Sequence, residues 1–214
     1  MKLADLTLKD FLDELGSDKA TPGGGAVAAL TGANAAGLVG MVAHLSLNHS
    51  EILEQIANIH EFITMADRLR EELRDAIDSD AQAFDRLMAA YKLPEDQEAA
   101  KQTRNQAIQS GLKAATESPL SIARSCYELL TIARSLTEVG NKQVVSDAGA
   151  AALLAEAALR SALLQARINL RSLKDTEYVT ASCNEIDRLE QLAQTNRDAA
   201  LQTTLAKLDT KPKA

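Results

Sequence analysis

The sequence predicts an all-α protein, a bundle of long helices, and composition is the first observation that favours this class. Hydrophobic residues make up 46% of the 214 residues, aromatic residues only 3%, and Trp is absent. The core must therefore be built from Leu, Ala, Ile and Val. Ala and Leu are among the best helix formers, whereas aromatic residues favour strands. Only four prolines occur, and one of them, Pro212, lies in the tail.

The second observation is an apolar periodicity that stays helical over an unusually long stretch, from Glu51 to about Tyr91. Its apolar stripe consists of Leu69, Leu73, Ile77, Phe84 and Met88. This stretch is much longer than an ordinary globular helix, so it predicts helices of bundle length.

The other predicted elements follow from caps and turns. A short helix begins after Thr7 and ends at Gly16, and a turn-rich loop precedes a helix from about Gly25 to Asn48. Another helix starts near Gln97, and Pro119 should kink or restart it. The remaining predicted features are a turn at Gly140-Asn141, a helix over 148–173 with Ser146-Asp147 as its N-cap pair, and a last helix over 176–208. We expect one domain over 1–210 and a frayed tail over 211–214.

Charge and targeting signals exclude several function classes. The net charge of −7 is well mixed along the chain, which argues against a nucleic-acid partner. The N-terminus lacks a signal-peptide pattern, and the longest apolar stretch, Ala26 to Leu47, contains Asn34 and His44. Two distant cysteines fit reduced thiols, and the three histidines show no metal-binding spacing. We therefore expect a cytoplasmic protein with no membrane partner and no metal.

Three glycines at the start of a helix form the first candidate site. The segment Thr21-Pro22-Gly23-Gly24-Gly25 exposes backbone N–H groups, and the helix N-terminus adds a partial positive charge. It could hold a carboxylate, a phosphate or the polar edge of a ring. The alternative is a tight turn packed against a neighbouring element.

Asp80 is the second candidate, because it lies on the apolar stripe between Ile77 and Phe84, with Tyr91 eleven residues on. An acid on a core-facing side is expensive unless it is paired or functional. The alternative is a structural ion pair or a cap for another segment.

The third candidate is a polar group before and along the helix that follows Gly140. It consists of Asn141, Lys142, Ser146, Asp147, Ser161, Gln165 and Asn169. Steps of three or four residues from Asp147 trace one helix face that turns from small and apolar to polar. Such a face could line a cleft; the alternative is capping by Ser146-Asp147 and hydrogen bonding between helices.

Six segments in order resemble the cyclodeaminase/cyclohydrolase family, which includes the C-terminal part of formiminotransferase-cyclodeaminase and stand-alone methenyltetrahydrofolate cyclohydrolases. They are TPGGGAVAALTGA (21–33), MVAHL (41–45), DAQAFDRLMAAYKLP (80–94), SPLSIA (118–123), GNKQVVSDAGAAALLAEAALR (140–160) and RINLRSLKD (167–175). The chain departs from the family at Ala26, at His44, in the run after His44, and at Ser161 and Gln165. These departures motivate an alternative, a non-catalytic folate-binding or helical assembly protein derived from the family.

The resemblance implies a dimeric helical bundle with a folate cleft and chemistry at the carbon that joins N5 and N10 of tetrahydrofolate. The activity would be that of a cyclohydrolase or a cyclodeaminase, with no cofactor. Because no formiminotransferase domain precedes the chain, we favour the cyclohydrolase.

We assign acid–base roles to two carboxylates in opposed environments. Asp80 would hold a proton, because desolvation raises its pKa, and Asp147 would stay ionised at a helix N-terminus. The expected substrate-binding residues are Pro22, Gly23, Gly24, Gly25, His44, Phe84, Tyr91, Lys142, Ser146, Asn169 and Lys174. Lys142, Arg167, Arg171 and Lys174 would receive an anionic, possibly polyglutamated, folate tail.

Overall fold

The computed structural model describes residues 2–47 and 56–208, and all regular structure in these ranges is helical. Two short elements come first, η1 (Leu3–Asp5) and α1 (Leu8–Leu15). The long helices are α2 (Gly24–Leu47), α3 (Ile56–Tyr91), α4 (Glu98–Val139), α5 (Val145–Leu170) and α6 (Thr176–Leu208), with the 3-10 turn η3 (Lys142–Val144) before α5. The predicted all-α bundle of long helices is confirmed.

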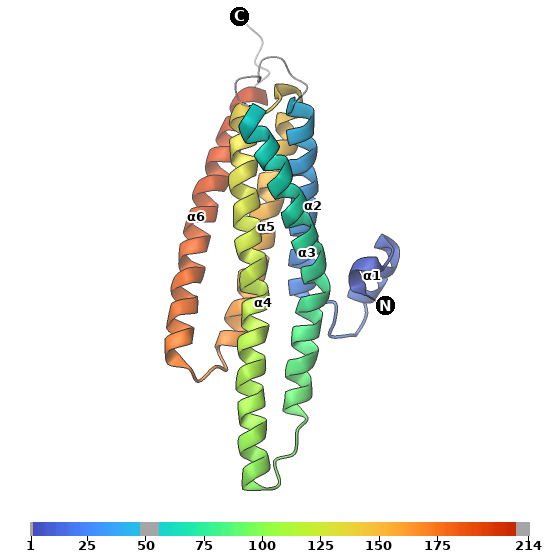
Figure 1. Cartoon of the computed structure of the whole chain (residues 1–214), viewed down its shortest axis with the longest axis vertical. Coiled ribbons are helices and arrows are strands. Elements are labelled where there is room, and N and C mark those ends of the chain that lie inside the picture. The colour runs from blue at the N-terminus through green and yellow to red at the C-terminus, as the bar shows by residue number, and fades with distance from the viewer. Residues whose placement is uncertain (1, 48–55, 209–214) are drawn as a thin grey trace, which may run out of the picture.

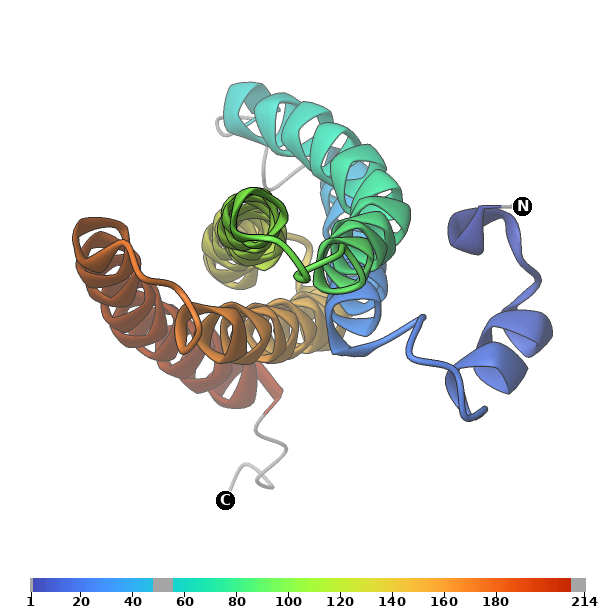
Figure 2. The same cartoon turned by 90° about the horizontal axis from the view of Figure 1, so that it is seen from below.

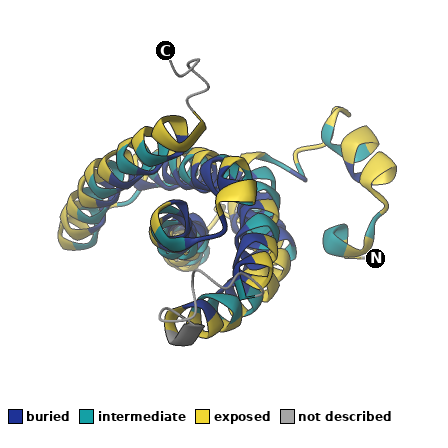
Figure 3. Ribbon diagram, turned by 90° about the horizontal axis from the view of Figure 1, so that it is seen from above, coloured by how far each residue is buried: buried dark blue, intermediate teal, exposed yellow. Residues whose placement is uncertain are grey.

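The helices run alternately up and down the long axis (Figure 1). Viewed along that axis, α3, α2, α5 and α6 form an arc around α4 (Figure 2). Buried residues line the inner faces of this arc (Figure 3). The core is mainly Ala and Leu, as the composition requires. The small alanine side chains allow the helices to approach one another closely.

Side-chain hydrogen bonds fix the two short elements of the N-terminal segment. Thr7 Oγ1 accepts a hydrogen bond from the Asp10 N–H and caps α1, and α1 ends at Gly16 as predicted. The Asp78 carboxylate of α3 accepts from the Leu3 and Ala4 N–H groups. The helix α1 lies outside the arc of long helices, on the side where α2 lies (Figures 1 and 2), and its Phe11 is buried in the hydrophobic core.

The prediction that Pro119 restarts its helix was wrong, whereas a kink at Pro119 stays a prediction. The helix α4 runs from Glu98 to Val139 with Pro119 inside it. Proline lacks an N–H and leaves the carbonyl of residue i−4 without its helical partner. That carbonyl belongs to Ala115, and it accepts a hydrogen bond of 2.7 Å from Asn169 Nδ2 of α5. A contact between distant helices thus compensates for the missing bond, which a local rule does not foresee.

The predicted N-cap pair Ser146-Asp147 was also wrong. The helix α5 begins at Val145, so both residues lie in its first turn and neither caps it. The N-cap position of α5 is Val144, and the side-chain cap belongs to η3, where Asn141 Oδ1 accepts a hydrogen bond from the Gln143 N–H. The predicted helix end at Asn48, the predicted helix start at Glu51 and the predicted tail over 211–214 lie outside the described residues.

Candidate functional site

A pocket of about 290 Å³ opens where α2 begins, between α3, α4 and the C-terminal part of α5. The helix α2 starts at Gly24, so below that point the space between α3 and α5 is not filled by a helix. Its lining residues are Asp80, Phe84, Leu87, Met88, Tyr91, Leu112, Ala115, Gln165, Ile168, Asn169 and Ser172. Four predicted site residues, Asp80, Phe84, Tyr91 and Asn169, thus line one pocket.

Asp80 is held against the N-terminus of α2. A Cβ atom added to Gly25 would overlap the Asp80 carboxylate, so only glycine allows this approach. The carboxylate accepts a hydrogen bond from the Ala26 N–H and one of 3.3 Å from Ser118 Oγ. The glycine segment thus approaches a carboxylate of its own chain, which gives a physical reason for Gly25.

The pKa of Asp80 is raised above its ordinary value. Burial is the main cause, since it disfavours the charged form, and the hydrogen bonds from Ser118 and Ala26 oppose it. No lysine or arginine is among the residues lining the pocket, so Asp80 is their single charged member. Asp80 can therefore exchange a proton with a bound ligand, and its negative charge when ionised suits a cationic ligand group rather than an anionic one.

Asn169 is the second oriented polar group of the pocket. Because a backbone carbonyl can only accept, the hydrogen bond to Ala115 requires that the amide nitrogen of Asn169 face α4. The Oδ1 atom is then left as an acceptor on the other side of the amide. Gln165 lies one turn earlier on α5, and its side chain occupies the space beside Gly24.

Four of the other predicted residues lie elsewhere. His44 is in the last turn of α2, Lys142 in η3, and Ser146 and Asp147 in the first turn of α5. Gln165 lies 18 residues after Asp147, so the two are about 27 Å apart along the axis of α5. Within one chain, Asp147 does not share a site with Asp80.

The predicted cluster of cations around α5 is not one cluster. Lys142 and Lys174 flank opposite ends of α5, and the Arg167 guanidinium pairs with Asp187 and Glu190 of α6. Lys174 follows Ser172 of the pocket by two residues, and it is the one predicted tail-binding lysine at this end. In the part of the chain that the structure describes, no group of three His, Cys, Asp or Glu residues could hold a metal ion.

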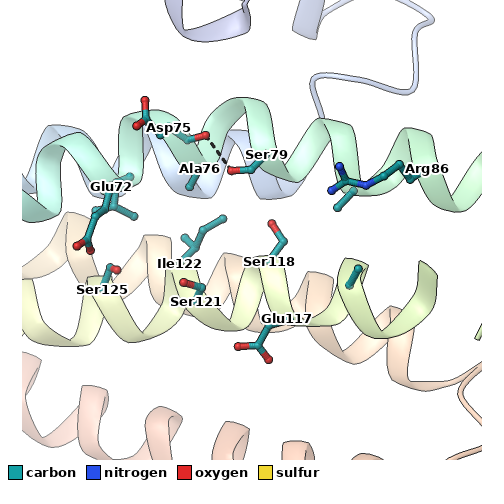
Figure 4. A pocket seen from close by; sticks show the side chains of 13 residues that line it. Glu72, Asp75, Ala76, Ser79, Arg86, Glu117, Ser118, Ser121, Ile122 and Ser125 are labelled. Carbon is teal, nitrogen blue, oxygen red and sulfur yellow. Dashed lines mark hydrogen bonds between the residues drawn. The ribbon is translucent and has the colours of Figure 1, made fainter. Parts of the chain in front are cut away.

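Sequence reasoning missed Ser118, because the Ser118-Pro119 pair was interpreted only as a break in a helix. A larger groove of about 640 Å³ runs between α3 and α4, and Ser118 lines this groove and not the smaller pocket. Ser118 points from α4 toward α3 there (Figure 4). The groove is lined by serines, alanines and surface charges and does not include Asp80, so the smaller pocket is the better candidate site.

Comparisons with known proteins point to one family. Residues 7–188 match the family model described as formiminotransferase-cyclodeaminase. A methenyltetrahydrofolate cyclohydrolase from Methylorubrum extorquens is 37% identical over 203 residues, which cover 95% of this chain and 98% of that protein. The formimidoyltransferase-cyclodeaminase of Rattus norvegicus is 30% identical over 90% of this chain, but over only 36% of its own length.

A crystal structure of formiminotetrahydrofolate cyclodeaminase from Thermotoga maritima has the same fold. Its TM-score is 0.88 at 26% identity, and the match covers 97% of this chain and 100% of that one. The match to the family model and the full-length similarity to the cyclohydrolase lead to one conclusion: this chain belongs to the formiminotransferase-cyclodeaminase family.

Proposed function

We propose that this protein is an enzyme of folate one-carbon metabolism, and that it acts as a methenyltetrahydrofolate cyclohydrolase. The observation that supports this most strongly is Asp80, the single charged group lining a pocket that is otherwise apolar and polar-neutral. The carbon between N5 and N10 of methenyltetrahydrofolate is part of a cation. A carboxylate with no competing positive charge in the lining can stabilise that cation and exchange a proton with it.

Asp80 can serve both proton transfers of the reaction. The cationic substrate favours the ionised carboxylate, so Asp80 can accept a proton as the oxygen of water bonds to the methenyl carbon. The resulting tetrahedral carbon is neutral, and burial then favours the protonated acid. Asp80 can return that proton to N5 as the bond between carbon and N5 breaks. The other water proton passes to solvent, and 10-formyltetrahydrofolate is the product.

The second candidate is formiminotetrahydrofolate cyclodeaminase, which the Thermotoga maritima structure favours. Here N10 attacks the formimino carbon and ammonia leaves, so the same acid would protonate a leaving nitrogen. The higher identity to the cyclohydrolase over nearly its whole length makes hydrolysis the first choice. A protein without either activity that still binds folate would instead fit the non-catalytic alternative.

One pair of assays tests the proposal. The loss of methenyltetrahydrofolate absorbance is followed beside ammonia release from formiminotetrahydrofolate, with Asp80→Asn as the inactive reference. We expect rapid loss of the methenyl absorbance and little ammonia. Faster ammonia release would favour the cyclodeaminase, and no turnover of either substrate would contradict both.

A homodimer through the outer faces of α2 and α5 is part of this proposal. These two helices pack against each other, and α2 contains no Asp, Glu, Lys or Arg. The outer sides of the two helices expose Met41, Leu45, Leu153, Leu164 and Ile168. Two helices of about 36 Å each offer an area typical of a stable interface. Since α2 contributes no charge and Arg160, on the Leu153–Leu164 face of α5, is paired with Glu156, this surface is compatible with a second copy of itself.

A dimer in which the α2 helices cross antiparallel would bring the separated residues together. Gly24 meets Gln165 at one end of the α2–α5 pair, and Asn141 contacts Ser46 at the other. A two-fold axis through the middle of α2 places the end with His44 and Asp147 near the partner's pocket. Asp147 would then act with Asp80 across the interface, and a folate tail could reach Lys142 of the partner subunit.

The other expectations remain proposals as well. The helix α2 is long and apolar enough to span a membrane, but 56% of its most apolar window is buried in the bundle, as in the core helix of a soluble protein. We propose a cytoplasmic enzyme that requires no cofactor and binds neither membrane nor nucleic acid. The net charge of −7 supports the last point.

A further inference from the structure

We propose that Pro119 is a positioning residue of the site, because it releases the carbonyl that orients Asn169. The inference rests on the proposed function only for its kinetic readout. Pro119 is the one proline inside the described long helices, and it lies in the buried part of α4.

The chain of contacts is short. An α-helical carbonyl normally accepts from the N–H four residues later, and at Ala115 that residue is Pro119, which has none. The ring of a proline inside a helix also clashes with the carbonyl four residues earlier. Asn169 Nδ2 donates to it at 2.7 Å, and both Ala115 and Asn169 line the pocket.

The neighbouring residue acts on the other polar group. Ser118 Oγ donates to Asp80 Oδ1 at 3.3 Å, so two consecutive residues of α4 fix the two oriented polar groups of the pocket. Ser118 holds the carboxylate, and Pro119 acts on the amide through the Ala115 carbonyl. Because Asn169 must turn its nitrogen to α4, it presents Oδ1, an acceptor suited to an N–H group of a substrate ring.

Pro119→Ala separates this role from a merely structural one. The new N–H donates to the Ala115 carbonyl within the helix and competes with Asn169. We expect the midpoint of thermal unfolding to rise, because proline is a poor helix residue, while KM rises about five- to tenfold, the scale of one hydrogen bond. The matched control is Thr103→Ala, an exposed change on the same helix, which should leave KM unchanged.

A double-mutant cycle with Asn169→Ala completes the test. If Pro119 acts through Asn169, Pro119→Ala has little further effect on KM in the Asn169→Ala background. The same double-mutant cycle can be measured on the midpoint temperature of thermal unfolding, which needs no substrate. It therefore distinguishes failure of this inference from failure of the proposed function. Additive effects in both KM and stability would overturn the inference, as would Pro119→Ala with an unchanged KM.

Discussion

Asp80 combines two opposed influences that no single sequence rule describes. Burial raises its pKa, while hydrogen bonds from Ser118 and from the Ala26 N–H lower it. The apolar stripe of α3 predicted the burial from the sequence alone. The partners come from α4 and from the start of α2, so they became visible only when the helices were packed.

Replacing Asp80 should weaken activity and not stability. We expect Asp80→Asn to lower kcat by roughly 10²-fold or more, the scale of one general acid–base contribution. The buried carboxyl has a raised pKa in the folded state, compared with about 3.9 in the unfolded chain. Its ionisation therefore costs stability as the pH rises through that folded pKa. The variant, which cannot ionise, should gain stability over the wild type across this window, measured by thermal unfolding from pH 4 to 8. A variant less stable at every pH would contradict the assignment.

Ser118→Ala should change the pH dependence of the reaction. The hydroxyl stabilises the ionised form of Asp80, so its removal raises the pKa of Asp80 further. The limb of the pH–rate profile that reports Asp80 is expected to move to higher pH, and Ser121→Ala, a neighbouring serine of the adjacent groove, provides the control. An unchanged limb would mean that Ser118 does not act on Asp80.

At the scale of elements, the two glycines that begin α2 have different neighbours. A Cβ at Gly25 would meet the Asp80 carboxylate, which Ser118 and Ala26 hold in place, whereas a Cβ at Gly24 would meet the flexible end of Gln165. We expect Gly25→Ala to lower kcat/KM by at least about tenfold, and Gly24→Ala to have a much smaller effect, with similar circular dichroism for both. Equal losses in the two variants would show that the segment acts as a whole and not through Asp80.

The presence of the helices was predictable from the sequence, because a long apolar periodicity and a capping residue such as Thr7 or Gly16 are local signals. The continuous helix through Pro119 was not, because its compensation comes from Asn169, 50 residues later in the sequence. The Ser146-Asp147 pair failed for a related reason, since Asn141 and η3 start the turn earlier. That Phe84 and Tyr91 line the same pocket as Asp80 was predictable, because all three lie on one face of one helix.

At the scale of the whole molecule, the exposed leucines offer a matched test of the dimer. Leu164 on α5 and Leu205 on α6 are each 64% exposed. Leu164→Lys would place a charge in the proposed interface, so we expect a monomer in sedimentation velocity and loss of activity, while Leu205→Lys stays dimeric. A wild-type protein that is monomeric at micromolar concentration would contradict the proposal.

Mixing inactive variants tests whether the two carboxylates act across the interface. If each site combines Asp80 of one subunit with Asp147 of the other, equal mixing of Asp80→Asn and Asp147→Asn makes half of the dimers heterodimers. Each heterodimer has one intact site and one site that lacks both carboxylates. After subunit exchange, activity should recover to about a quarter of the wild-type value, since complementation follows from closed two-fold symmetry. No recovery from two inactive, dimeric variants would show that Asp147 does not complete the partner's site.

The most direct test of catalysis by Asp80 is the initial rate of methenyltetrahydrofolate hydrolysis by the wild type and by Asp80→Asn, measured by absorbance at saturating substrate. We expect turnover well above the uncatalysed rate for the wild type, and a kcat lower by roughly 10²-fold or more for a folded variant that still binds folate. A wild type with no turnover, or an Asp80→Asn variant with a normal kcat, would contradict it.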